Sequence, residues 1–302
     1  MNKKFLSIAC AVACSFLWGT AFVAQDTGMD YIGPWTFSAA RLILGFLVLF
    51  PFVLIFELKK ILKTKIDLKF VIAYLFLLGF LLAGGNIFQQ ISLLYTDVAN
   101  SAVFTVLYVV IVPIIAYFIF SKKIHKSVWP SVLMCLFGGL LLSELDNLRV
   151  RFGDSLVVIG AFFWAFHIVY ISKFLKIFNF PITIASLQCL TAAIFSLIPA
   201  YSLEYISFTV LSLEATEIIY AGVLSSGIAF MFQIIALQYL SPAPAEIIFS
   251  LEGVFAAVAA WILLDQYLNE LKVFGIVIIL SAVIFSQLAP IYGNKYKHNG
   301  RN

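Results

Sequence analysis

The sequence predicts an all-α integral membrane protein with ten transmembrane helices, arranged as two inverted five-helix repeats around a central cavity. Three observations support this prediction: the composition, the placement of basic residues and an internal repeat. Of the 302 residues, 63% are hydrophobic and 11% are charged, whereas a soluble domain has about 45–50% and about 25%. A soluble fold of this length cannot bury so much apolar surface, so we expect that surface to face lipid.

Charged clusters divide the chain into ten apolar runs, most of them near the roughly 20 residues that a helix needs to cross a bilayer. The run 128–142 is the shortest. Lys3 and Lys4 before an apolar stretch resemble a signal peptide, but the stretch continues to Ala24, so we expect a first span there. The predicted helices are Phe5–Ala24, Pro34–Phe56, Phe70–Leu94, Val98–Phe120, Val128–Leu142, Ser155–Ser172, Pro181–Tyr201, Thr216–Tyr239, Ala243–Leu264 and Val273–Ala289.

Basic residues predict the orientation of these helices. With the amino terminus in the cytoplasm, most of the 19 Lys and Arg fall in cytoplasmic segments, and Arg149, Arg151 and Lys272 fall outside, with Arg41 inside a span. This positive-inside bias favours an even number of spans, with both termini cytoplasmic in a bacterial inner membrane. The cytoplasmic set is Lys3, Lys4, Lys59, Lys60, Lys63, Lys65, Lys69, Lys122, Lys123, Lys126, Lys173, Lys176, Lys295, Lys297 and Arg301.

An internal repeat relates the two halves of the chain. The segment that begins at Ser92 matches the segment that begins at Ala236, at an offset of 144 residues. Near the start of each half, "FLWG" around Trp18 matches "FFWA" around Trp164 at an offset of 146, and Pro34 matches Pro181 at an offset of 147. The matches come in the same order in both halves, as a duplication predicts.

Five helices per half make the repeat inverted, because an odd number of spans gives the second half the opposite orientation. We expect residues 1–143 to form the first repeat and residues 144–302 the second repeat with a cytoplasmic tail. Two inverted halves that face each other leave a cavity near the middle of the membrane, which is typical of alternating-access carriers.

Three segments resemble the EamA family of the drug/metabolite transporter superfamily: "WGTAFVAQ" from Trp18, "AARLILG" from Ala39 and "LQYLSPAPAEIIFSLEGVFAAVAAWILL" from Leu237. The resemblance implies a ten-helix carrier of amino acids, other metabolites or toxic compounds. Some members import nucleotide-like metabolites such as S-adenosylmethionine. The chain departs from the family pattern at Gly253, where a proline is usual, and at Asp265-Gln266, where the family has Gly-Glu.

Glu252 is the first candidate functional residue. It follows Ala243 by nine residues, about 14 Å along a helix, which places it near the middle of the membrane. A carboxyl group there must face a cavity, pair with a cation or be protonated. It could bind a cationic substrate group or couple a proton, or it could form a structural hydrogen bond. Tyr108, its repeat mate, shares a helix face with Ser101 and Thr105 and could contact substrate or a neighbouring helix.

Arg41 lies about 10 Å from the outer end of the second span, and its repeat mate is Gln188. Its guanidinium could hold a substrate carboxylate or phosphate. Alternatively, it could extend outward to water or pair with an acidic residue. Glu246, three residues past an inner loop, is expected at the membrane interface.

Aromatic residues form a third candidate group. Trp164 and His167 share a helix face, and Trp18 occupies the matching place in the first half. The two tryptophans could stack on an apolar or heterocyclic substrate and His167 could relay a proton, or all three could simply pack between helices.

Gln89 and Gln233 are matched polar residues on stripes of small residues. Gln89 follows Gly85 by one turn, and Gln233 follows Ala229 by one turn. Both could contact substrate, although small residues in membrane helices serve close helix packing as well.

These features favour a secondary carrier of a small organic metabolite, with amino acid exchange or export as the leading interpretation. No nucleotide-binding P-loop, metalloprotease or serine-hydrolase motif is present, so we expect no enzyme activity, no cofactor and no metal. One alternative is an importer of a nucleotide-like metabolite such as S-adenosylmethionine. Alternatives from other classes are a membrane-embedded transferase, whose acidic cluster would be Glu144 with Asp146, and a structural subunit or receptor. We expect a monomer or homodimer in the lipid bilayer, with no nucleic-acid partner.

Overall fold

Helices form all the regular structure that the computed structural model describes, which covers residues 3–121, 125–142 and 151–299, with the backbone alone for Ala99 and residues 290–299. The predicted repeat boundary at 143/144 lies outside the described residues. The same is true of some residues on which the predicted orientation and the transferase alternative depend: Lys122, Lys123, Glu144, Asp146, Arg149 and Arg301.

Each of the ten predicted helices is present. Nine described segments are long and apolar enough to cross a membrane, and α7 is a shorter apolar helix of 15 residues. The elements are α1 (Lys3–Thr27), α2 (Pro34–Phe52) with η1 (Val53–Glu57) and α3 (Leu58–Ile61), α4 (Leu68–Ser92), α5 (Val98–Thr105), α6 (Tyr108–Phe120), α7 (Val128–Leu142), α8 (Phe152–Phe174), α9 (Pro181–Leu203), α10 (Phe208–Leu213), α11 (Ala215–Ile219), η3 (Tyr220–Ala229), α12 (Phe230–Tyr239), α13 (Pro242–Phe249), α14 (Leu251–Leu263) and α15 (Glu270–Asn299).

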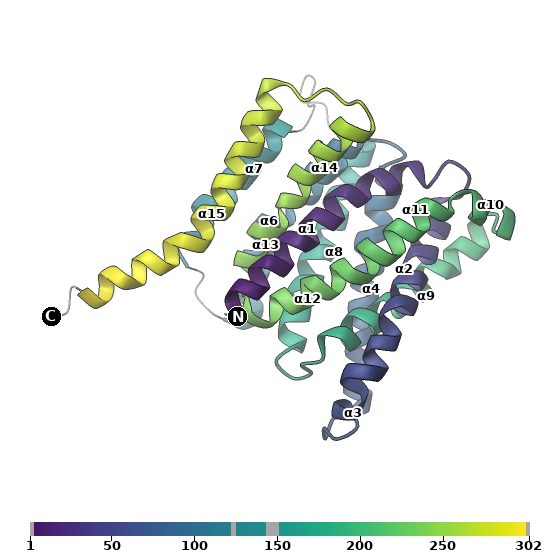
Figure 1. Cartoon of the computed structure of the whole chain (residues 1–302), viewed down its shortest axis with the longest axis horizontal. Coiled ribbons are helices and arrows are strands. Elements are labelled where there is room, and N and C mark those ends of the chain that lie inside the picture. Colours follow the sequence, from purple (N-terminus) through teal and green to yellow (C-terminus); the bar gives the residue numbers. More distant parts are fainter. Residues whose placement is uncertain (1–2, 122–124, 143–150, 300–302) are drawn as a thin grey trace.

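Helix packing repeats between the two halves. The first span, α1, packs against η3, α12, α13 and α14. Its repeat mate α8 packs against α4, the mate of η3 with α12, and against α5 and α6, the mates of α13 and α14. Two mated pairs pack on each other, α2 with α9 and α7 with α15, at opposite edges of the bundle (Figure 1). This exchange of partners is what two inverted five-helix repeats around a shared centre predict. We call the end where α1 begins and α3 lies the inner end, and the opposite end the outer end.

The α2–α9 pair is joined at both ends by carboxylates that cap helix amino termini. At the inner end, Glu57 accepts hydrogen bonds from the backbone N–H groups of Ile182 and Thr183, at 3.1 and 2.7 Å. At the outer end, Glu204 accepts from the two N–H groups that follow Pro34, at 3.0 and 2.7 Å. Each helix begins with proline, which has no N–H, so these are the first free donors of the helix.

The two caps are repeat mates, because Glu57 and Glu204 differ by the same 147 residues as Pro34 and Pro181. A carboxylate at a helix amino terminus satisfies free donors and complements the positive end of the helix dipole. Each half therefore caps the other, and the two contacts bridge opposite ends of the bundle.

Two spans are interrupted at matching places. The fourth span breaks at Val106 and Leu107, between α5 and α6, and the ninth breaks at Ser250, between α13 and α14. The sequence predicted continuous runs at both. The breaks lie at the repeat offset of 144 residues and place Tyr108 and Glu252 in the first turn of α6 and of α14. At both places the backbone keeps right-handed helical dihedrals. The N–H groups of Val109 and Gly253 donate to the carbonyl groups three residues earlier, so each interruption is a tightened turn of the 3₁₀ type.

We predict that Glu57→Ala and Glu204→Ala each lower the stability of the folded protein by about 0.5–2 kcal/mol, the usual contribution of a helix cap. Thermal unfolding of the purified protein in detergent measures the effect. Glu270→Ala, at an exposed position at the start of α15, is the matched control. Equal melting temperatures for the cap variants and the wild type would show that the caps do not hold the α2–α9 pair.

Candidate functional site

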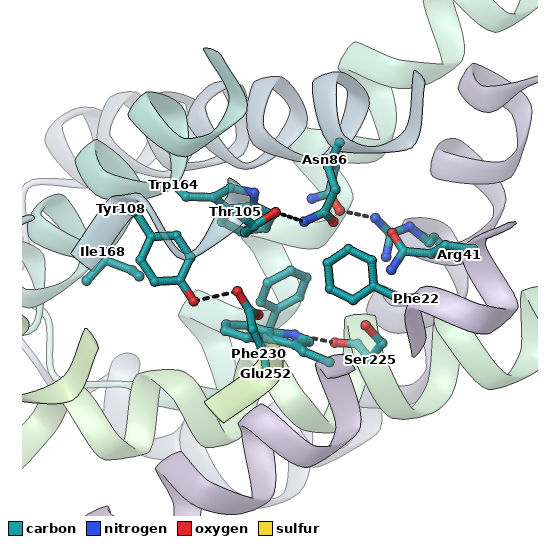
Figure 2. A pocket seen from close by; sticks show the side chains of 13 residues that line it. Phe22, Arg41, Asn86, Thr105, Tyr108, Trp164, Ile168, Ser225, Phe230 and Glu252 are labelled. Atoms are coloured by element: carbon teal, nitrogen blue, oxygen red, sulfur yellow. Dashed lines mark hydrogen bonds between the residues drawn. The ribbon is translucent and has the colours of Figure 1, made fainter. Parts of the chain in front are cut away.

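A small cavity of about 30 Å³ lies between the two repeats (Figure 2). Both halves of the chain contribute, and the walls combine charged, amide, hydroxyl and aromatic side chains. Six of the eight candidates from the sequence are among the lining residues. The lining consists of Trp18, Phe22, Gln25, Arg41, Asn86, Gln89, Thr105, Tyr108, Trp164, Ile168, Ser225, Phe230 and Glu252.

Glu252 and Tyr108 meet at the two helix breaks. The Tyr108 hydroxyl donates a 2.6 Å hydrogen bond to Glu252 Oε1, and both side chains are buried, with 2% and 3% of their surface exposed. These residues are repeat mates, so the bond joins the two halves across the approximate two-fold axis. A carboxyl group in this place has one protein partner and a face toward the cavity (Figure 2).

Arg41 enters the same cavity from α2 without a carboxylate partner. Its Nη2 donates to Asn86 Oδ1, its Nε has no hydrogen-bond partner among the described residues, and only 2% of its surface is exposed. The guanidinium neither extends to water nor pairs with an acid. The ion pair that the described residues do form joins Arg151 and Asp97 elsewhere. A buried cation without a counterion is costly, which suits a site that receives an anionic group.

An aromatic surface forms another wall of the cavity. The rings of Trp18 and Trp164, which are repeat mates, lie with centroids 6.2 Å apart, and Phe230 contacts both, at 5.5 and 6.0 Å. The Trp18 indole N–H donates to the carbonyl oxygen of Ser225, at 3.3 Å. Ser225 belongs to η3, a π-helical segment, and π-helical turns frequently occur at functional sites.

Gln89 lines the cavity and donates a 3.0 Å hydrogen bond to Thr105 Oγ1, which itself donates to the carbonyl of Ser101. This chain of bonds fixes the outer part of the cavity wall between α4 and α5. The amide of Gln89 therefore has a structural partner as well as a place in the lining.

The structure places three other residues away from the cavity wall. His167 is fully buried and shares a 3.1 Å hydrogen bond with Gln188. Gln233 is fully buried, with neither side-chain amide atom hydrogen-bonded among the described residues. Glu246, expected at the interface, is instead fully buried, because helix rotation directs it into the bundle and not toward the inner loop.

Several lining residues did not stand out in the sequence, among them Phe22, Ile168 and Phe230. The repeat offsets carry the signal that finds them. Phe22 and Ile168 are mates at the same offset of 146 as the tryptophans, and Asn86 and Phe230 are mates at 144. Both members of each of these pairs line the cavity, as Trp18 and Trp164 do, whereas Gln233, the mate of Gln89, does not.

The two ends of the protein differ. At the outer end, Thr96 donates a 2.6 Å hydrogen bond to the buried carboxylate of Asp154, and Arg151 pairs with Asp97. These contacts tie the turn before α5 to the start of α8. The inner end has a second pocket of about 620 Å³, which is lined by the ends of α6, α8 and α12 and the start of α13. Among the described residues, polar contacts therefore join the helices at the outer end, and the larger pocket lies at the inner end.

We predict that Gly85→Ala displaces Trp164, because an added Cβ would lie 2.8–2.9 Å from three indole ring atoms. Overpacking of this kind costs about 1–3 kcal/mol. The expected result is a lower melting temperature together with a changed intrinsic tryptophan fluorescence. Gly139→Ala is the control, since its Cβ would meet only Val103, at 3.4 Å. An unchanged spectrum and melting temperature in Gly85→Ala would contradict the predicted contact.

Known proteins similar to this chain are described as transporters. A protein of Archaeoglobus fulgidus described as an uncharacterized transporter is 28% identical over 279 residues, covering 91% of this chain and 83% of the relative. The uncharacterized transporter YdfC of Bacillus subtilis is 24% identical over 305 residues, covering 98% and 95%. One crystal structure of a protein has a TM-score of 0.77 at 16% identity, covering 94% of this chain and 96% of that chain.

A model of the EamA-like transporter family matches residues 5–144 and 151–288, one match in each half of the chain. The match covers most of the sequence and confirms the resemblance of the three segments. Together with the apolar helices, it identifies a multi-pass membrane protein. The chain belongs to the EamA-like transporter family.

Proposed function

We propose that this protein is a secondary carrier of a small zwitterionic metabolite, an amino acid or a compound derived from one. One observation supports the substrate class above all others. Arg41 and Glu252, one from each repeat, are buried in the same cavity, and neither has an ion-pair partner among the described residues. A ligand with a carboxylate and an amino group has one charge for each of them.

Glu252 has two proposed roles that use the same carboxyl group. It accepts the cationic group of the substrate, and it carries a proton when the substrate is absent. Tyr108 orients it through the 2.6 Å hydrogen bond. Because a lone carboxylate is costly inside the membrane, the empty cavity favours the protonated acid, and substrate and proton compete for one group.

A nucleotide-like metabolite such as S-adenosylmethionine is the second candidate substrate. The aromatic surface of Trp18, Trp164 and Phe230 supports it, because a purine ring stacks on aromatic faces. The buried indole N–H of Trp164 has no hydrogen-bond partner among the described residues and could donate to a ring nitrogen. This substrate also carries a carboxylate and an amino group, besides the positive charge of its sulfonium, so it uses the same two charged groups.

The difference between the two ends supports transport by alternating access. The outer contacts of Thr96 with Asp154 and of Arg151 with Asp97, and the inner pocket, fit a conformation that opens to the inside. In an inverted repeat, the opposite conformation exchanges the roles of the two halves.

We further propose a bacterial inner-membrane location with both termini cytoplasmic, on the basis of the positive-inside bias. We also propose that the chain divides into its two repeats at 143/144. The functional unit in this proposal is a monomer or homodimer. The cavity is lined within one chain. We expect no catalysis, because the family model that matches both halves of the chain describes transporters.

Thermal-shift screening of the purified protein identifies the substrate, because a ligand that binds the native state raises its apparent stability. The screen compares amino acids, nucleotides, S-adenosylmethionine and sugar phosphates. Stabilisation by amino acids or S-adenosylmethionine, with none by sugar phosphates, is the expected pattern. Stabilisation by sugar phosphates alone would contradict the zwitterion proposal.

We predict that Glu252→Gln folds normally but loses transport of the identified ligand in proteoliposomes by about 10- to 100-fold, since hydrogen bonds to charged groups contribute about 1.5–3 kcal/mol. Tyr108→Phe retains the acid and should lose less. Glu270→Gln, at an exposed position, is the control. Normal flux in Glu252→Gln, with its pH dependence retained, would refute the proposed role.

We predict that Arg41→Gln abolishes the preference for ligands that carry a carboxylate. In the thermal-shift assay, the wild type should distinguish an amino acid from its amide by about tenfold or more in affinity, because one charge-assisted contact contributes at least about 1.5 kcal/mol. The variant should bind the two alike. A variant that still prefers the carboxylate would show that Arg41 is a structural partner of Asn86 only.

A further inference from the structure

Glu246 is a buried acid that does not line the central cavity. It lies on α13, none of its surface is exposed, and neither carboxyl oxygen has a hydrogen-bond partner among the described residues. A buried polar group without a partner costs about 1–3 kcal/mol, and a charged one costs more. Packing alone therefore does not explain a carboxyl group at this position.

The surroundings of Glu246 contain a second unsatisfied polar side chain. Gln233, on the adjacent helix α12, is fully buried, and both its amide atoms lack partners among the described residues. Cys14, also fully buried, belongs to α1, which packs against both α12 and α13. Helices α1, α12 and α13 pack on one another. Carboxyl and amide groups without hydrogen-bond partners among the described residues therefore lie on both α12 and α13.

Glu246 lies between the central cavity and the inner pocket. It precedes Glu252 by six residues, about 9 Å along a helix. Ala243 and Pro244, within three residues on the other side, line the inner pocket. Along the ninth span, the acid therefore lies between the central carboxyl group and the inner pocket.

A proton is the ligand that this chemistry suits. The oxygens of Glu246 and the single amide oxygen of Gln233 are too few for a cation such as Na⁺ or Ca²⁺, which takes six or more oxygen ligands. Two coupled buried acids, in contrast, disfavour ionisation of both at once, so a proton gained by one is easily lost by the other.

We propose that Glu246 is a second proton-binding site, which passes a proton between Glu252 and the inner pocket. This inference rests on the proposed role of Glu252 in coupling. In the outward-to-inward step, the proton leaves the Glu252 carboxyl group, is bound by the Glu246 carboxylate, and is released to water in the inner pocket. The reverse order returns it.

The titratable groups that face Glu246 from the packed helices share its environment. They are Cys14 of α1, Tyr108 of α6 and Glu252 of α14, which are buried on helices that pack against α13. Cys135 of α7 contacts the neighbouring Ser250 at 3.3 Å. The two carboxyl groups are the strongest acids of this set, since the reference pKa is about 4.3 for Glu, about 8.5 for Cys and about 10 for Tyr.

Infrared spectroscopy of the reconstituted full chain tests the proposal, because a protonated carboxylic acid has its own carbonyl band. The band is titrated with pH in the wild type, Glu246→Gln, Glu252→Gln and the control Glu270→Gln. We expect Glu246→Gln to lose one titrating component, and Glu252→Gln to lose the other and to move the midpoint of the component that remains.

Labelling of the wild type with dicyclohexylcarbodiimide gives a second measurement that needs no variant. This reagent modifies protonated carboxyl groups in apolar surroundings, and mass spectrometry locates the adduct. An adduct on Glu246 that disappears as the pH rises supports the proposal, even if Glu246→Gln fails to fold.

Two results would overturn it: titrating bands unchanged in Glu246→Gln, or a Glu246 that keeps its proton at every pH. If Glu252 titrates and Glu246 does not, the relay fails and the carrier proposal stands. If Glu246 titrates while Glu252→Gln transports normally, the proposed coupling by Glu252 fails and Glu246 remains a proton site.

Discussion

The reciprocal capping of α2 and α9 holds the two halves of this protein in register. A helix inside a bilayer has no water to satisfy the N–H groups at its start, so a partner must come from the protein. Here Glu57 serves α9 and Glu204 serves α2. Because α2 also packs against η3 and α4, and α9 against α4 and α12, a fixed α2–α9 pair sets the positions of the helices around the cavity.

The interruptions in the fourth and ninth spans lie where the two repeats face each other. At Val106 and at Ser250 the turn tightens while the backbone stays helical. Tyr108 and Glu252 follow these turns directly and meet on the axis that relates the halves. Polar groups are concentrated where the two repeats face each other, and the exposed faces present large apolar side chains such as Phe118 and Ile198.

Much of the fold was predictable from the sequence. Hydropathy indicates the length and polarity of each span, and charge bias indicates whether the number of spans is even. Mated residues such as Trp18 and Trp164 also indicated the central cavity. The helix breaks and the π-helical η3 were not predictable, because an interrupted span is as apolar as a continuous one. Helix rotation decides the environments of His167, Gln233 and Glu246. Successive side chains point 100° apart around a helix axis, and only packing between helices fixes which of them faces the cavity.

The residue pairs on the two-fold axis have a consequence for the direction of transport. Trp18 and Trp164 contact each other, as do Tyr108 and Glu252, so exchange of the two halves leaves each pair in place. A bound solute would keep the same aromatic and acidic neighbours whether the cavity opened inward or outward. Its intrinsic affinity would then be nearly equal on the two sides of the membrane, and the direction of net flux would follow the gradients of solute and proton.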